Sequence, residues 1–76
     1  MHRYDLLELL TEQPFRPFRM RLSLNVDVEV RHPETAILQH SAIRIEPPSQ
    51  PGQISEGTII VSLGQIVSIE YIPRKA

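Results

Sequence analysis

Apolar residues occupy every second position from Phe18 to Val30, and no glycine or proline interrupts this run of 13 residues. Strict alternation of this kind is typical of a β-strand with one buried face. A straight strand of that length would extend about 43 Å, whereas a folded chain of this size has a diameter of about 30 Å. The pattern therefore predicts a hairpin or a strongly bent strand.

The position of the turn follows from residue type and from parity. Asn25 is the residue in this run that best tolerates a left-handed backbone, so we place the turn around it. A two-residue loop at Leu24-Asn25 would bring Asp27 and Glu29 to the core face. An odd-numbered loop avoids this, and we predict a three-residue loop over 24–26 or one strongly bent strand.

The predicted loop also fixes which side chains face each other. On the inner face it pairs apolar residues, namely Leu22 with Val28 and Met20 with Val30. On the outer face it sets Arg21 opposite Glu29, a favourable cross-strand pair. It also sets Arg19 opposite Arg31, which requires Glu34 or a bound anion between the two guanidinium groups.

The segment before this run predicts a short helix. Four leucines share one narrow stripe, at Leu6, Leu7, Leu9 and Leu10. Asp5 stands near the predicted start, where the helix dipole favours an anion, and Pro14 ends the helix. We expect a helix over about residues 4–13 that packs on the rest of the fold, because about two and a half turns do not persist alone in water.

Short apolar segments typical of strands follow at residues 36–38, 41–46, 58–63 and 66–72. A proline-rich loop at 47–53 separates them, and we expect it to tolerate insertions. The sequence shows no internal repeat and no second domain. We therefore predict a single domain over residues 1–76, mainly β: a small SH3-like or Sm-like barrel of about five strands over about residues 16–73, with one N-terminal α-helix.

Two segments, QPFRPFRMRLS and VEVRHPE, resemble a group of short uncharacterised bacterial proteins with a leucine-rich leading helix, a PFxPF entry, a hairpin and a VRHPE segment. In that group the turn carries Asp-Gly where this chain has Leu24-Asn25. The resemblance implies a bacterial origin and brings no activity with it.

At a coarser level, a helix, several strands and the final LGQIVSIE segment resemble the Sm-like barrel, and its Hfq-type members in particular. In that family a Lys-His pair in the last turn contacts RNA. The matching positions here are Leu63 and Gly64, so the resemblance does not bring those RNA contacts with it.

Composition limits the classes of function. The net charge is −1, so the field of the whole molecule does not attract nucleic acid. No apolar run approaches the roughly 18 residues of a membrane span, and there is no cysteine to indicate an oxidising compartment. We expect a cytoplasmic protein without a membrane association.

The most concentrated polar motif is Arg31-His32-Pro33-Glu34. No Ser or Cys nucleophile motif accompanies it, so we expect a structural role in which Pro33 ends a strand and Glu34 pairs with Arg31. The three histidines, His2, His32 and His40, lack the spacing of metal ligands. We therefore predict no catalytic residue, no metal site and no cofactor.

The sequence leaves two interpretations of its basic residues. One cluster consists of Arg16, Arg19, Arg21 and Arg31, with Phe15 and Phe18 interleaved. Such mixtures bind phosphates and stack bases in RNA-binding or single-strand-binding modules. The alternative is a solvated strand face whose charges are partly paired. Phe18 favours this alternative, because it alternates in phase with Met20 and Leu22 and should lie in the core.

The last two apolar segments carry more apolar residues than a strand with one buried face needs. The excess comprises Ile59, Ile60, Val61, Ile66 and Val67. We expect residues 58–72 to form the main contact of a homo-oligomer. The function that the sequence favours is a non-enzymatic protein-interaction or self-assembly module, with an unidentified protein as a further partner.

Overall fold

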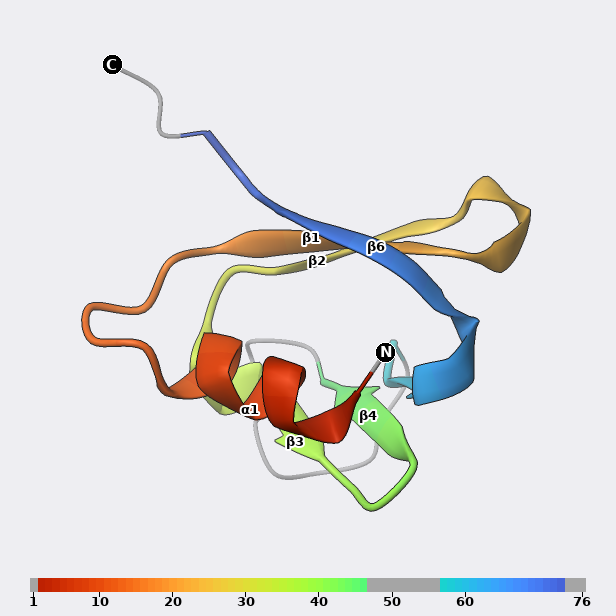
Figure 1. The fold of residues 1–76 in the computed structure, drawn as a ribbon, viewed down its shortest axis with the longest axis horizontal. Helices are drawn as coiled ribbons and strands as arrows, with labels where there is room; N and C mark the ends of the chain where they lie inside the picture. Colours follow the sequence, from red (N-terminus) through yellow and green to blue (C-terminus); the bar gives the residue numbers. More distant parts are fainter. Residues whose placement is uncertain (1, 47–56, 74–76) are drawn as a thin grey trace.

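The computed structural model describes residues 2–46 and 57–73, which form one α-helix, six β-strands and three short 3-10 turns (Figure 1). The helix and strands are α1 (Arg3–Thr11), β1 (Phe18–Leu22), β2 (Asp27–Val30), β3 (Ala36–Leu38), β4 (Ala42–Ile45), β5 (Ile59–Ser62) and β6 (Ile66–Tyr71). The 3-10 turns are η1 (Ser23–Asn25), η2 (Pro33–Thr35) and η3 (Leu63–Gln65). The prediction of a mainly β chain with one N-terminal helix is confirmed. The predicted loop at 47–53 lies outside the described residues.

The strands form two antiparallel sheets, with the orders β2-β1-β6 and β3-β4-β5. Among the described residues the strands form these two small sheets and no single closed barrel is found, so the architecture observed at this level is two antiparallel sheets with one helix. The sheets divide where η2 separates β2 from β3 and where η3 separates β5 from β6. Pro33 begins η2 and has no N–H to donate to a ladder, so strand pairing stops there.

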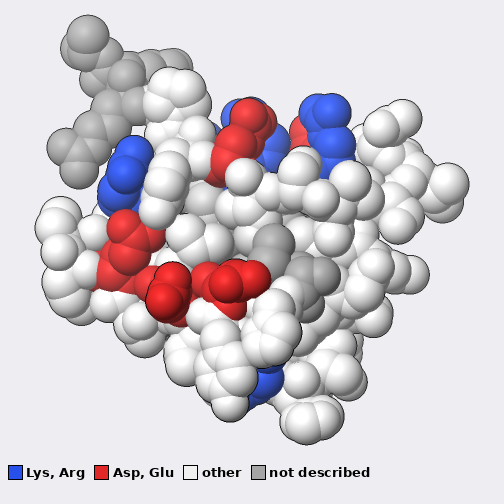
Figure 2. All heavy atoms as spheres, viewed as in Figure 1, with Lys and Arg blue, Asp and Glu red and all other residues white. Residues whose placement is uncertain are grey.

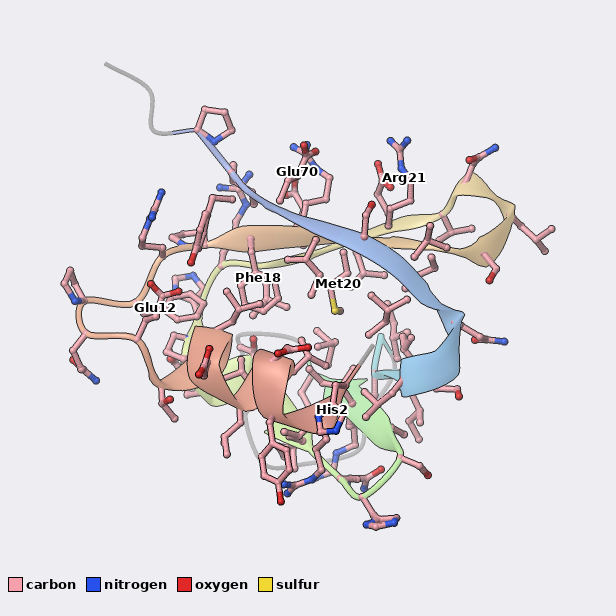
Figure 3. The ribbon with its side chains drawn as sticks, viewed as in Figure 1. His2, Glu12, Phe18, Met20, Arg21 and Glu70 are labelled. Atoms are coloured by element: carbon pink, nitrogen blue, oxygen red, sulfur yellow. The ribbon has the colours of Figure 1, made fainter. Side chains whose placement is uncertain are left out.

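Both sheets and the helix contribute to one hydrophobic core. Its fully buried side chains are Leu6 of α1, Phe18 and Met20 of β1, Val30 of β2 and Ile43 of β4. Figure 3 shows Phe18 and Met20 pointing between the layers, whereas Arg21 and Glu70 point away from them. Each buried side chain of this size stabilises the fold by about 1.5–3 kcal/mol. The apolar side chains at alternate positions of β1 therefore determine which face of the strand packs into the core.

The run from Phe18 to Val30 is a hairpin with a three-residue loop. The observed pairs are Phe18 with Val30, Arg19 with Glu29, Met20 with Val28 and Arg21 with Asp27. The loop is Ser23–Asn25, closed by the Leu22 N–H, which donates to the Val26 carbonyl at 2.7 Å. The predicted odd loop and apolar inner face are confirmed, and the predicted pairing is wrong by two residues because the loop begins one residue earlier.

The backbone of the turn explains this position. Leu24 and Asn25 both adopt the left-handed conformation, with φ values of 65° and 59°. Consecutive left-handed residues match the right-handed twist of a hairpin, which is why Asp-Gly or Asn-Gly is favoured in such turns. Leu24 is 93% exposed, so its side chain has room although its backbone is strained.

Helix α1 is shorter than predicted, since it ends at Thr11 and Gln13 precedes Pro14. His2 caps its start, where the imidazole Nδ1 accepts a hydrogen bond from the Tyr4 N–H at 3.2 Å. Three of the four predicted leucines face the core, with Leu6 buried and Leu9 and Leu10 packed beside it. Leu7 is 40% exposed and lies outside the stripe.

A β-bulge shapes the start of β6. Ile66 and Ile69 both belong to the core or pack against it, although inward positions in a regular strand are separated by an even number of residues. The register shifts between Arg21, paired with Ser68, and Leu22, paired with Ile66, so Val67 is the extra residue. Val67 is consequently 68% exposed.

Candidate functional site

Three of the four predicted anion-binding arginines are paired with carboxylates on the outer face of the β2-β1-β6 sheet. Arg19 lies at its centre, with Nη2 3.1 Å from Glu29 Oε2 and Nη1 2.8 Å from Glu70 Oε1. Its hydrogen bond to Glu70, and to a smaller extent its hydrogen bond to Glu29, raise the pKa of Arg19 above its ordinary value. Arg19 therefore bridges the acids of the two flanking strands.

Two further ion pairs extend this network. Arg21 Nε lies 3.1 Å from Asp27 Oδ1, and this bond raises the pKa of Arg21. Arg31 Nη2 lies 3.0 Å from Glu29 Oε1, so Arg31 pairs with Glu29 and not with Glu34 as predicted. Glu29 accepts hydrogen bonds from Arg19 and from Arg31. Both bonds lower the pKa of the Glu29 carboxyl group, and the bond from Arg19 has the larger effect. The observed register thus replaces the expected arginine repulsion with complementary charges.

The fourth arginine has a different partner. The guanidinium carbon of Arg16 lies 3.7 Å from the centre of the Tyr71 ring, a cation–π contact. Phe15 is half-buried with its ring 6.1 Å from that of Phe18, which is fully buried, so the two phenylalanines pack in and beside the core. The structure therefore brings the predicted basic residues to β1, β2 and the segment before β1, and each already has a partner.

The sequence reasoning missed the Arg44–Glu46 pair. In the sequence, Arg44 and Glu46 alternate with the apolar Ile43 and Ile45, but Glu46 is buried and the side chain of Arg44 is only 18% exposed. Arg44 Nε and Glu46 Oε2 are 3.3 Å apart. Opposite charges two residues apart on one strand are the signal that could have indicated the pair, since such residues share a face. Because both side chains are largely shielded from water, each charge is stabilised by the opposite charge beside it.

The predicted oligomer residues divide into two groups. Val61 and Ile66 belong to the core of the single chain, so they are not available to a partner. Ile59, Ile60 and Val67 are exposed by 44%, 62% and 68%. Within the described residues β5 pairs with β4 and β6 pairs with β1, and each has a second edge that pairs with no strand.

Polar side chains also line a hollow of about 630 Å³ where the start of α1 meets the β3–β4 turn and η3. His2 and His40 both line it. His2 is engaged as the helix cap and stacks on Tyr4 with a ring separation of 5.1 Å. In the part of the chain that the structure describes, no three His, Asp or Glu residues gather closely enough to hold a metal ion.

No family model matches the chain, and no curated protein or solved structure matches it either. Among residues 2–46 and 57–73, no helix has the length and apolar character needed to cross a membrane.

Proposed function

We propose that this protein is a non-enzymatic self-assembly module in which the free edge of β5 in one copy pairs with the free edge of β6 in the next. One observation carries the proposal: both strands have an edge that pairs with no other described strand, and both present exposed apolar side chains. Ile60 on β5 and Val67 at the β6 bulge are the most exposed of these side chains.

Unpaired strand edges present N–H and C=O groups that can pair with another chain. Because β5 and β6 are different edges of the same chain, their pairing is a head-to-tail contact, which generates a ring when the rotation between copies closes. Assembly would also cover exposed apolar surface. This matters for a domain of 76 residues, because a domain of that size buries only a small hydrophobic core by itself.

We also propose that the two sheets belong to a small barrel of the Sm-like or SH3-like type. An Sm-like or SH3-like barrel is supported by the N-terminal helix, the hairpin after it and the short η3 turn before the last strand. Edge pairing between neighbouring copies is the use that Sm-like rings make of their fourth and fifth strands, which correspond here to β5 and β6.

The alternative function, binding of RNA or a single strand through Arg16, Arg19, Arg21 and Arg31, has less support. Three of these guanidinium groups already contact carboxylates, which an incoming phosphate would have to displace. Arg16 is free of carboxylate contacts in the described part of the chain, but it covers Tyr71. A titration with a uridine-rich RNA across a salt series addresses this alternative, since a steep salt slope indicates phosphate contacts.

Analytical ultracentrifugation at low and high micromolar concentration tests self-assembly. We expect the wild-type chain to sediment as an oligomer and Ile60→Lys and Val67→Lys to sediment as folded monomers. Both side chains are exposed in the single chain, so lysine should not disturb its core. Val26→Lys is the matched control, because Val26 is also apolar and 51% exposed but immediately precedes β2, the opposite edge strand of its sheet.

Two results would contradict the proposal. One is a wild-type chain that stays monomeric at the highest concentration. The other is dissociation of the oligomer by Val26→Lys to the same extent as by Ile60→Lys, because the contact would then not be specific to β5 and β6. Circular dichroism of each variant establishes that a monomer is folded.

A further inference from the structure

An open groove runs between α1 and β6. It consists of two adjoining hollows of about 320 Å³ and 450 Å³, and Leu9 and Tyr71 line both. Ile69 lines the first hollow, and Thr11 lines the second. Its lining residues run from the first turn of the helix to the residue after its end on one side, and they come from β6 on the other side.

The floor of the groove is apolar. Leu9 and Ile69 are half-buried and pack against the core, and they also line the open hollow beside it. Tyr71 is 38% exposed. Apolar surface that is concave and reachable from solvent is the usual floor of a site for a partner's side chain.

The rim of the groove is acidic. Asp5 and Glu8 are three residues apart, so they lie on one side of α1. Glu12 directly follows the helix, and Glu70 stands across the groove on β6. Figure 2 shows these acidic side chains in a row over the helix, with a further acidic group beyond the hollow. Four carboxylates thus surround an apolar floor.

The four acids differ in how far they are neutralised. Glu70 pairs with Arg19, and Glu12 Oε1 accepts a hydrogen bond from the Tyr71 hydroxyl at 2.6 Å. Within the part of the chain that the structure describes, neither Asp5 nor Glu8 forms an ion pair. Asp5 and Glu8 therefore give this groove local negative charge that no ion pair among the described residues offsets, although the net charge of the whole chain is only −1.

The chain itself shows how a cation fits at one end of this surface. Arg16 lies over the Tyr71 ring, and the Tyr71 hydroxyl donates a hydrogen bond to Glu12, the residue that directly follows α1. An aromatic face beside a carboxylate attracts a guanidinium or ammonium group through both the ring quadrupole and the charge.

From the charge and shape of this groove we propose that it binds a short basic segment of a partner protein. An apolar side chain of the partner contacts Leu9 and Ile69, and lysine or arginine residues on either side of it contact Asp5 and Glu8. Nucleic acid and anionic lipid surfaces carry the same sign of charge as the rim and are repelled. This inference does not rest on the self-assembly that we propose for β5 and β6.

A labelled peptide tests the inference directly. The probe carries two leucines flanked on each side by two lysines, and the control peptide carries serines in place of the leucines. We expect the leucine peptide to bind at least about tenfold more tightly, because only it offers apolar surface to the floor. Amide chemical shifts of the wild-type chain should change at Leu9, Ile69 and Tyr71. Binding should weaken as the ionic strength rises from about 0.05 to about 0.5 M.

A matched pair of protein variants tests the rim. Glu8→Gln and Glu34→Gln both remove one exposed carboxylate, but only Glu8 lines the groove. We expect Glu8→Gln to weaken binding about two- to fivefold, the range of one exposed charge contact. Glu34→Gln should leave the affinity unchanged.

Four results would overturn the inference: no binding of the leucine peptide, equal binding of both peptides, shifts confined to the arginine face, or equal effects of the two variants. Repeating the titration with Ile60→Lys separates this groove from the β5–β6 contact. If amide shifts in the groove depend on protein concentration without peptide, and this dependence disappears in Ile60→Lys, then a second copy occupies the groove and the inference fails.

Discussion

Arg19 lies directly opposite Glu29 across β1 and β2, and its Nη2 is 3.1 Å from the Glu29 carboxylate. The charged side chains on the outer face are thus complementary in the observed register of the hairpin. The predicted register would have set Arg19 opposite Arg31, whereas the observed one lets Glu29 accept from both arginines. Side-chain electrostatics and turn geometry therefore favour the same pairing.

The Glu29 network makes stability depend on pH. Its arginine partners lower the pKa of Glu29 in the folded chain, so its contribution is complete above the ordinary carboxyl pKa of about 4.3 and is lost as the pH falls through the lower folded value. We expect Glu29→Gln to lower the melting temperature at pH 7 and to have little effect near pH 2. Thermal melts at both pH values measure this. A difference that persists unchanged at low pH would show that the substitution acts through something other than charge.

The hairpin turn carries removable strain. Leu24 has a φ of 65° and is 93% exposed, so glycine relieves the backbone without loss of packing. We expect Leu24→Gly to increase the free energy of unfolding by about 0.5–1 kcal/mol, since the left-handed cost of about 1–2 kcal/mol exceeds the added chain entropy of glycine. Urea denaturation measures the change. Leu24→Ala is the control, because it removes the exposed side chain but keeps the strain, and an equal gain from both would refute the role of φ.

Two valines test where the buried face of β2 begins, because Val28 lies inside the strand and Val26 is the loop residue that precedes it. Val28 is 9% exposed and Val26 is 51% exposed, although they are identical residues two positions apart. We expect Val28→Ala to lower the free energy of unfolding by about 2 kcal/mol through lost burial and a small cavity. Val26→Ala should change it by less than about 0.5 kcal/mol. Equal losses in urea denaturation would contradict the observed hairpin register.

The Tyr71 hydroxyl reports on the groove between α1 and β6. Its hydrogen bond to Glu12, and then desolvation, raise the pKa of Tyr71 above its ordinary value against the opposing effect of Arg16. The neutral phenol is therefore favoured by folding, and this contribution to stability is lost as the pH rises through the raised pKa. We expect Glu12→Gln to lower the pKa of Tyr71. Phenolate absorbance measured across a pH titration gives this pKa, and Tyr71→Phe identifies which part of the signal belongs to Tyr71. An unchanged titration would mean that Glu12 does not hold the hydroxyl in solution.

The sequence by itself determined the N-terminal helix, the strand character of the segments that follow it and the inward face of the hairpin strands. Within the two strands of the hairpin, alternation fixed which residues face inward, because a one-residue slip would bury Asp27 and Glu29. The leucine spacing and Pro14 located α1 to within two residues, since both act through local backbone geometry.

Only the tertiary structure decided where the turn sits, how the sheets divide and which charges are paired. Asn25 alone could not locate the turn, because Leu24 also adopts a left-handed backbone that leucine disfavours and that the strand pairing imposes. The bulge at Val67 depends on Ile66 and Ile69 both packing toward the core, which local alternation cannot indicate. The groove combines α1 with β6, elements from opposite ends of the chain, so its acidic rim and apolar floor appear only when the fold brings them together.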